Sequence, residues 1–232
     1  MISRKDLEEI CREFKVECRF HDKETFEMRT LYSFKEKVFK PYEIYVPKEN
    51  ILEAMCRKRM LKSKEDCLEY FKMNIEHEVK HAEKETEILR KCNELLYLYK
   101  TTPTIIRHVE NACEDVAIEK ELELKYSRIF HTQCIPHIER NIKSIVSEIE
   151  RIIGEKKDFT NFLNMAVTYV SCFAETKLID ALTKANISSE VKEILKNIVN
   201  VLVELRESKA TLCDCVVKVL YNTLRLISTK YS

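Results

Sequence analysis

The 232-residue sequence contains one glycine, one glutamine and no tryptophan. A phosphate-binding loop needs several closely spaced glycines, so the single Gly154 excludes the glycine-rich nucleotide-binding loops. No stretch approaches the run of about 18 apolar residues that a membrane span needs. The charged start, MISRKDLEEICREF, also lacks the apolar segment of a signal peptide. We therefore expect a cytoplasmic protein with no membrane partner.

An excess of basic residues is also missing. The 40 Lys and Arg residues are balanced by 39 Asp and Glu residues, which leaves a net charge of +1. Nucleic-acid-binding proteins concentrate basic residues to neutralise phosphates, so we expect no nucleic-acid partner. The densest basic run, residues 57–64, is followed at once by acidic residues, and we interpret it as a solvated helix face.

The ten cysteines include no C-x-x-C pair, which argues against a structural zinc knuckle. The scarcity of Gln and the 34% of charged residues are typical of hyperthermophile proteins, whose intracellular members can contain disulfides. We predict a source among hyperthermophilic archaea or their viruses, and at least one disulfide. Buried free thiols that pack as small apolar groups are the alternative.

Strand-like segments occur only near the start of the chain. Residues 15–21, 26–34 and 42–47 are rich in aromatic and β-branched residues and predict three strands, preceded by a helix over 3–14. Apolar spacing and capping residues then predict helices over 49–60, 63–99, 102–130, 136–154, 158–185, from 188 onward, and 208–228. We interpret residues 131–136 as a connection and Gly154 as a helix end.

The predicted fold class is α+β. A small antiparallel or mixed sheet of three strands packs on helices in a first domain, residues 1–135, and a helical bundle follows in residues 136–232.

The string His77-Glu78-Val79-Lys80-His81 has the pattern H-E-x-x-H and falls within a predicted helix. At about 100° per residue, both histidines lie beside an apolar stripe that must pack inward. That stripe consists of Leu68, Phe71, Ile75, Val79 and Ala82, and the flank with the histidines also carries Cys67, Tyr70, Asn74, Glu85, Ile88 and Cys92. Two imidazoles at i and i+4 can share one zinc ion, and Glu78 between them can take a proton from water. Ordinary surface pairs on a charged helix are the alternative.

A catalytic zinc site needs a third protein ligand, and the next helix supplies acidic residues. If two straight helices met at residue 101, His81 would lie about 30 Å from the turn and Asp115 about 21 Å from it. A bend within residues 84–97 would remove that offset, whereas Glu119 fits two straight helices better. Both therefore stay candidates.

H-E-x-x-H followed by a helix with N-x-x-E-D-x-x-I-E resembles the zincin metallopeptidases. The pattern is most similar to the predicted metallopeptidase domains found beside von Willebrand A domains. The matching residues are His77, Glu78, His81, Asn111, Glu114, Asp115, Ile118 and Glu119, and the resemblance covers residues 1–130. It implies that Asp115 or Glu114 completes the metal site and that Glu119 contacts a ligand rather than the metal. The sequence departs from the family's pattern in the long gap between His81 and Asp115 and in having no glycine soon after His81, where many relatives bend or end the helix.

Other polar residues are weaker candidates. Tyr126, His131 and His137 could stabilise an oxyanion, and His108 or Glu110 could bind the metal. We predict a zinc-dependent metallopeptidase whose peptide or protein substrate lies along an edge of the sheet. A catalytically inactive zincin-fold structural or regulatory protein and a metal-free helical interaction protein are the two alternatives.

Overall fold

The computed structural model describes residues 2–92, 103–155 and 158–229. The chain forms two compact units. The first unit comprises Met1–Glu87 and Glu121–Gln133, and the second unit comprises Ile88–Lys120 and Cys134–Ser232. Helices α3 (Lys64–Lys91) and α5 (Pro103–Lys125) each contribute residues to both units. The proposed division into domains 1–135 and 136–232 stays a prediction.

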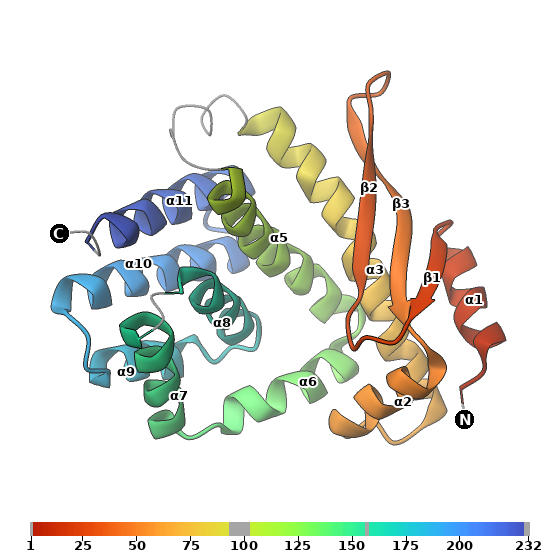
Figure 1. The fold of residues 1–232 in the computed structure, drawn as a ribbon, viewed down its shortest axis with the longest axis horizontal. Coiled ribbons are helices and arrows are strands. Elements are labelled where there is room, and N and C mark those ends of the chain that lie inside the picture. Colours follow the sequence, from red (N-terminus) through yellow and green to blue (C-terminus); the bar gives the residue numbers. More distant parts are fainter. Residues whose placement is uncertain (1, 93–102, 156–157, 230–232) are drawn as a thin grey trace. The chain divides into compact units, whose positions relative to one another are not determined.

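A three-stranded mixed sheet lies in the first unit (Figure 1). Its strands β1 (Glu17–His21), β2 (Glu27–Ser33) and β3 (Val38–Pro47) lie in the order β1-β3-β2. β1 runs parallel to β3, and β2 is antiparallel to it, so the α+β prediction with a mixed sheet is confirmed. β3 begins four residues earlier than expected because a tight turn, with Lys37 at φ 55°, joins it directly to β2.

Two short helices flank the sheet in the chain. α1 (Arg4–Glu13) begins at a capping box, in which Ser3 and Asp6 satisfy each other's backbone N–H groups. α2 (Glu49–Lys58) follows β3 directly. α3 begins where it was expected, because the Ser63 hydroxyl accepts a hydrogen bond from the backbone N–H of Asp66 at 2.9 Å. The expected end of this helix at Tyr99 lies outside the described residues.

One face of α3 packs on the sheet. Phe71, Ile75 and Ala82 from the predicted stripe are buried, whereas Leu68 and Val79 are half-buried. Near the end of this face, the Thr86 hydroxyl accepts a hydrogen bond of 2.8 Å from the backbone N–H of Phe39. Burying a phenylalanine or isoleucine side chain contributes about 1.5–3 kcal/mol. The buried side chains of this face, together with the hydrogen bond from Phe39, therefore fix the orientation of α3 against the sheet.

The helix expected over 102–130 is present and begins at Pro103, but its expected end and the connection expected over 131–136 are wrong. α5 ends at Lys125, and a new helix, α6, spans Ser127–Glu139 with Pro136 inside it. Ile129, Phe130 and Cys134 are buried at spacings of a helix face, and this apolar face holds the helix together although proline removes one backbone hydrogen bond.

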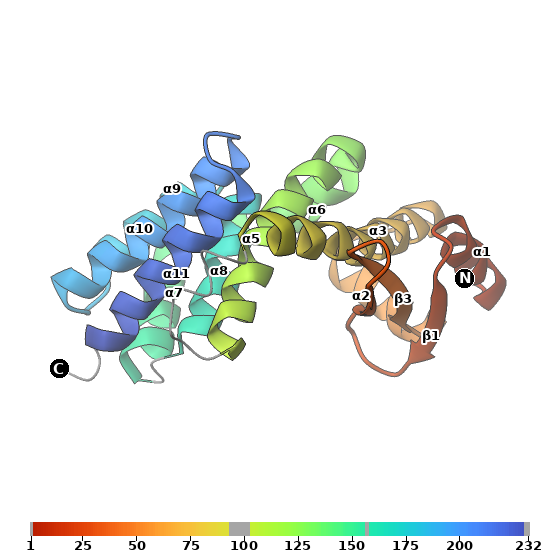
Figure 2. The same ribbon diagram turned by 90° about the horizontal axis from the view of Figure 1, so that it is seen from above.

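The second unit contains the predicted helical bundle. α7 (Ile142–Ile149) continues into a π-helical turn (Glu150–Glu155), followed by α8 (Phe159–Ser171), α9 (Glu175–Lys184), α10 (Ser189–Arg206) and α11 (Leu212–Thr229). Figures 1 and 2 show α10 and α11 side by side. Asp158 and Ser188 cap helices as predicted. Among the described residues, no helix is both long and apolar enough to cross a membrane.

Two expected helix boundaries in the second unit are wrong for the same reason. The helix expected over 158–185 is two helices, and α10 ends at Arg206 while Ser208, the expected start of the last helix, lies just beyond that end. Phe173 and Ser208 have φ of 55° and 60°. The backbone N–H of Ala174 donates to the Tyr169 carbonyl, and that of Lys209 donates to the Glu204 carbonyl. This is the Schellman pattern that closes a helix.

Cysteines pair up in both units. Four pairs lie at disulfide-bonding distance, with Cα–Cα separations between 5.1 and 6.1 Å: Cys11–Cys18, Cys56–Cys67, Cys92–Cys213 and Cys134–Cys172. Cys113 and Cys215 are buried free thiols, and the Cys215 thiol donates to the Cys113 sulfur at 3.0 Å. Both predicted uses of cysteine are therefore present.

Candidate metal centre

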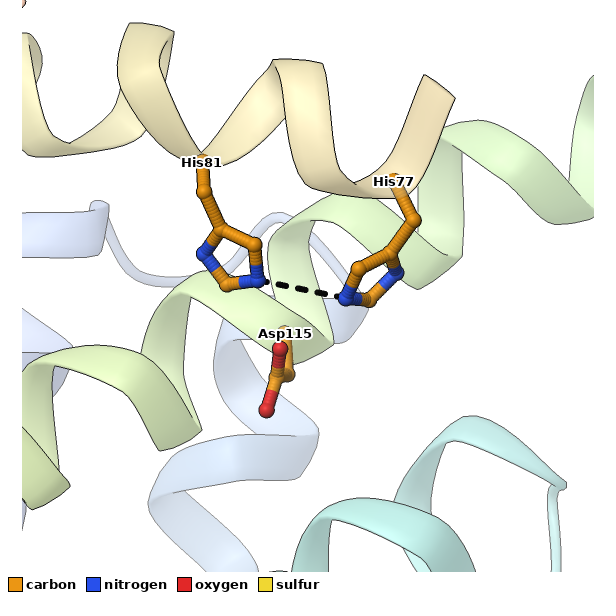
Figure 3. Close-up of side chains that lie close together, drawn as sticks. All are labelled: His77, His81 and Asp115. Atoms are coloured by element: carbon orange, nitrogen blue, oxygen red, sulfur yellow. Dashed lines mark hydrogen bonds between the residues drawn. The ribbon is translucent and has the colours of Figure 1, made fainter. Parts of the chain in front are cut away.

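His77 and His81 project from the same side of α3, one helical turn apart (Figure 3). Their Nε2 atoms are 3.2 Å apart, and their ring centroids are 5.0 Å apart with the rings inclined at 68°. Both side chains are half-buried. The i, i+4 spacing therefore brings two imidazole nitrogens together, as the sequence predicted.

The separation of these nitrogens fits a shared metal ion. Zinc binds imidazole nitrogen at about 2.0–2.1 Å, so two nitrogens 3.2 Å apart would subtend an angle of about 100° at the ion. That angle is close to tetrahedral. The same separation also suits a direct hydrogen bond in which one ring donates to the other. The pair accommodates zinc with little rearrangement.

Asp115 is the third member of the group. Each of His77, His81 and Asp115 offers one potential ligand atom, and these atoms lie within 4.8 Å of one another (Figure 3). Within the described parts of the chain, this is the one group of three or more His, Cys, Asp or Glu side chains whose potential ligand atoms lie close enough together to hold a metal ion. Two imidazoles and one carboxylate form a donor set that zinc accepts.

The other acidic candidates on α5 lie outside this group. Glu114 is 1% exposed, and Glu119 is half-buried. Ile118, which the family pattern places between them, is fully buried and packs as an apolar residue. The sequence suggested a bend within residues 84–97 as one way to align Asp115 with His81. α3 is one continuous helix as far as Lys91, and residues 93–97 lie outside the described chain.

Ion pairs line the side of α3 that faces away from the sheet. The Glu121 carboxylate accepts hydrogen bonds from the Lys80 and Lys84 ammonium groups at 2.6 and 2.7 Å, and Lys125 donates to Glu76 at 2.6 Å. Burial by itself raises the pKa of Glu121, but the two lysines outweigh it, and the pKa falls below its usual value. The histidines thus lie between an apolar face and an ion-paired face of one helix.

Tyr126, a candidate for stabilising an oxyanion, is engaged elsewhere. Its hydroxyl donates a hydrogen bond of 2.7 Å to the Glu76 carboxylate, and the side chain is 5% exposed. Burial and the Glu76 carboxylate both raise the pKa of Tyr126. Tyr126 therefore holds Glu76 in place within the first unit.

The remaining histidine candidates lie in ordinary settings. His131 is exposed, 3.9 Å from the Glu123 carboxylate. His137 packs edge-on against Tyr169, and burial lowers the pKa of its imidazole. His108 packs edge-on against Phe159.

Glu85 is the residue of this region whose role the sequence did not reveal. It lies on α3 on the same flank as the histidines, and its Oε2 atom is buried without a hydrogen-bond partner in the described chain. An unsatisfied buried polar group costs about 1–3 kcal/mol, and more when it is charged. Its position on the histidine flank was readable from the spacing, but its burial was not.

No protein-family model, curated protein or solved structure matches this chain.

Proposed function

We propose that this chain is a zinc-dependent peptidase of the zincin type. One observation carries the proposal: His77 and His81 place two Nε2 atoms 3.2 Å apart on one helix face, and Glu78 lies between them in the sequence. Two histidines that were close only by chance would not be expected to have a glutamate directly after the first of them, as Glu78 follows His77. Asp115 is the acid we assign as third ligand, because its carboxylate belongs to the same group.

Each residue has a separate role in this proposal. His77, His81 and Asp115 hold the metal, and zinc, when bound, acts as a Lewis acid that makes water more acidic and polarises a carbonyl group. Glu78 accepts the proton of the attacking water and returns it to the leaving amine. The half-buried position of the histidines limits access of bulk water and strengthens the electrostatic interactions between these groups.

The sheet offers a place for the substrate. β1 and β2 are its two edges, and an extended peptide can add to an edge strand through backbone hydrogen bonds. The β2 side is the more apolar, since Leu31 is 55% exposed and Phe34, just beyond β2, is 85% exposed. We therefore assign an unfolded or extended peptide with apolar side chains as the substrate.

The first experiment combines metal content with hydrolysis of an unfolded protein substrate. Elemental analysis of the purified chain should give one zinc per chain, and the parent should cleave the substrate. Glu78→Gln should keep the zinc and lose cleavage, because the amide cannot accept the proton. Glu83→Gln, an exposed position on the same helix, is the matched control and should keep both properties.

The outcomes separate the alternatives. A chain that binds zinc but cleaves nothing, with or without Glu78→Gln, is a metal-containing structural or regulatory protein. A chain without zinc is a helical interaction protein in which the two histidines simply hydrogen-bond to each other.

The cytoplasm of a hyperthermophile is the location we assign to this activity. Four cysteine pairs at disulfide distance are unusual for a cytoplasmic protein of a mesophile, but intracellular proteins of hyperthermophiles contain such bonds.

A further inference from the structure

The first unit contains a pocket of about 330 Å³ where α2 is joined to α3. Its walls come from the segment before α1, from α2, from the connection between the two helices and from the start of α3. The volume lies within the roughly 300–1,000 Å³ of pockets that hold small molecules. None of the residues of the metal-binding group lines this pocket, so the proposed peptidase site does not account for it.

Part of the lining is apolar. Ile2, Cys56, Leu61 and Cys67 are each at most 7% exposed, and all four line the pocket. The end of α2 explains the place of Leu61. Met60 adopts a φ of 59°, and the backbone N–H of Leu61 donates to the Cys56 carbonyl at 3.0 Å, which closes the helix and directs the leucine side chain inward. These walls can cover the apolar body of a small ligand.

The rest of the lining is charged, and two of its three cations have acidic partners. Lys64 Nζ lies 2.8 Å from Asp6 Oδ2. The Arg57 guanidinium lies 4.0 Å from the Glu53 carboxylate, which also accepts the backbone N–H of Ile2 at 2.7 Å. The charges of these two cations are therefore offset by two carboxylates.

Lys62 is the third cation of the lining. It lies in the connection between α2 and α3, its side chain is exposed, and it forms no ion pair or hydrogen bond with any residue that the structure describes. Three positive and two negative side chains leave one positive charge at the pocket. An apolar wall with a small number of placed polar groups is the usual make-up of a small-molecule site.

We propose that this pocket binds a small amphipathic monoanion, a short apolar chain that ends in one carboxylate. The chain lies against the buried apolar side chains, and the carboxylate lies against Lys62. A phosphate monoester carries nearly two negative charges at neutral pH, so the single uncompensated positive charge fits a carboxylate better. This site goes beyond the proposed peptidase activity and does not depend on zinc.

The test is a titration of the full chain with octanoate, below the concentration at which it forms micelles, followed by nitrogen-15 NMR. The amide signals of residues 61–67 should shift and saturate together. Octanol has the same chain without the charge, and it should bind about two- to fivefold more weakly, the usual contribution of one exposed ion pair. Octylammonium has the opposite charge and should cause no saturable shift of these signals.

Substitutions locate the charge that recognises the carboxylate. Lys62→Gln should weaken octanoate binding by about two- to fivefold and leave octanol binding unchanged. Lys62→Glu should weaken octanoate binding further. Lys58→Gln is the matched control, because Lys58 belongs to the same basic run, is exposed, pairs with Glu24 and does not line the pocket. It should bind octanoate like the parent. High salt should reduce the difference between the parent and Lys62→Gln, since it screens exposed charges.

Each contrary result has a definite meaning. Octylammonium or octanol that binds as tightly as octanoate, or Lys62→Gln that binds octanoate like the parent, would overturn the carboxylate assignment. No saturable shift with octanoate, or shifts confined to signals outside the pocket, would overturn the site itself. Zinc is absent from every step, so a failure here leaves the proposed peptidase standing, and a chain without zinc leaves this pocket standing.

Discussion

The α3 helix of the first unit and the α10–α11 pair of the second unit bury different kinds of side chain. Along α10 and α11 the buried positions are mostly aliphatic, as at Leu195, Leu202, Val216 and Leu220. Along α3 one face is apolar, the opposite face forms ion pairs, and the histidines lie between them. The histidines of α3 therefore lie beside both apolar and charged neighbours, whereas the buried positions of α10 and α11 are surrounded mostly by aliphatic side chains.

The two regions contribute differently to stability. A buried leucine contributes about 1.5–3 kcal/mol, whereas a partly exposed ion pair contributes about 0–1 kcal/mol. The α10–α11 pair therefore supports the fold, and the polar groups of α3 mainly determine where the histidines lie. Four substitutions and one thiol titration follow, beginning with the largest expected effect.

Leu202→Ala should lower the free energy of unfolding by about 2–5 kcal/mol, because a fully buried leucine leaves a cavity. Urea unfolding followed by circular dichroism measures the change. Asn200→Ala, at an exposed position of the same helix, should change stability by less than about 0.5 kcal/mol. Zinc affinity of folded Leu202→Ala should equal that of the parent, and a large loss would contradict the division of roles.

Asp115→Ala should weaken zinc binding by more than about 100-fold, beyond the loss expected for an outer partner of a ligand. Glu119→Ala should cost about 10- to 100-fold if Glu119 contacts a ligand. Glu114→Ala should act on stability instead, because this carboxylate is 1% exposed and lies outside the group. Chelator competition measures all three. If Glu114→Ala loses zinc while Asp115→Ala keeps it, the assignment of the two acids is reversed.

Ser208→Gly should raise the free energy of unfolding by about 1 kcal/mol, because a non-glycine residue at φ 60° is strained. Ser208→Ala should show no gain, since alanine has the same strain, and this variant also removes the hydroxyl that accepts a hydrogen bond from Lys120. Thermal and urea unfolding measure both variants. A gain in the alanine variant would show that the backbone is not the cause.

Glu121→Gln should lower stability at neutral pH by about 1 kcal/mol or less, since this carboxylate is 41% exposed. Lys80 and Lys84 hold its folded pKa below the usual 4.5, so its contribution is full above pH 4.5. That contribution disappears as the pH falls through the lowered pKa, and the parent and variant should converge there. Urea unfolding at several pH values measures the difference. A constant difference down to strongly acidic pH would contradict the ion-pair argument.

The last prediction concerns how many cysteine thiols react before and after unfolding. Titration of the unreduced protein should detect two thiols after unfolding and none before it, because Cys113 and Cys215 are buried. Burial and the neighbouring thiol of Cys215 raise the pKa of Cys113, which keeps it unreactive in the folded state. Ten reactive thiols after unfolding would show that all four pairs are reduced.

Helix starts were easier to predict than helix ends in this chain. Ser63, Asp158 and Ser188 cap the helices that they were expected to cap, because a capping side chain acts within its own turn. The ends of α8 and α10 were missed because such ends usually depend on glycine, and here Phe173 and Ser208 adopt the left-handed conformation instead. Such residues give no local signal.

The sequence by itself determined the α+β class and the shared helix face of His77 and His81, because both follow from residue spacing along one strand or one helix. Tertiary structure decided the rest. It grouped Asp115, rather than Glu114, with the histidines, and it buried the Glu85 oxygen. It also directed the Tyr126 hydroxyl to Glu76. Each of these features depends on how segments distant in sequence pack together, and residue spacing within one helix does not contain that information.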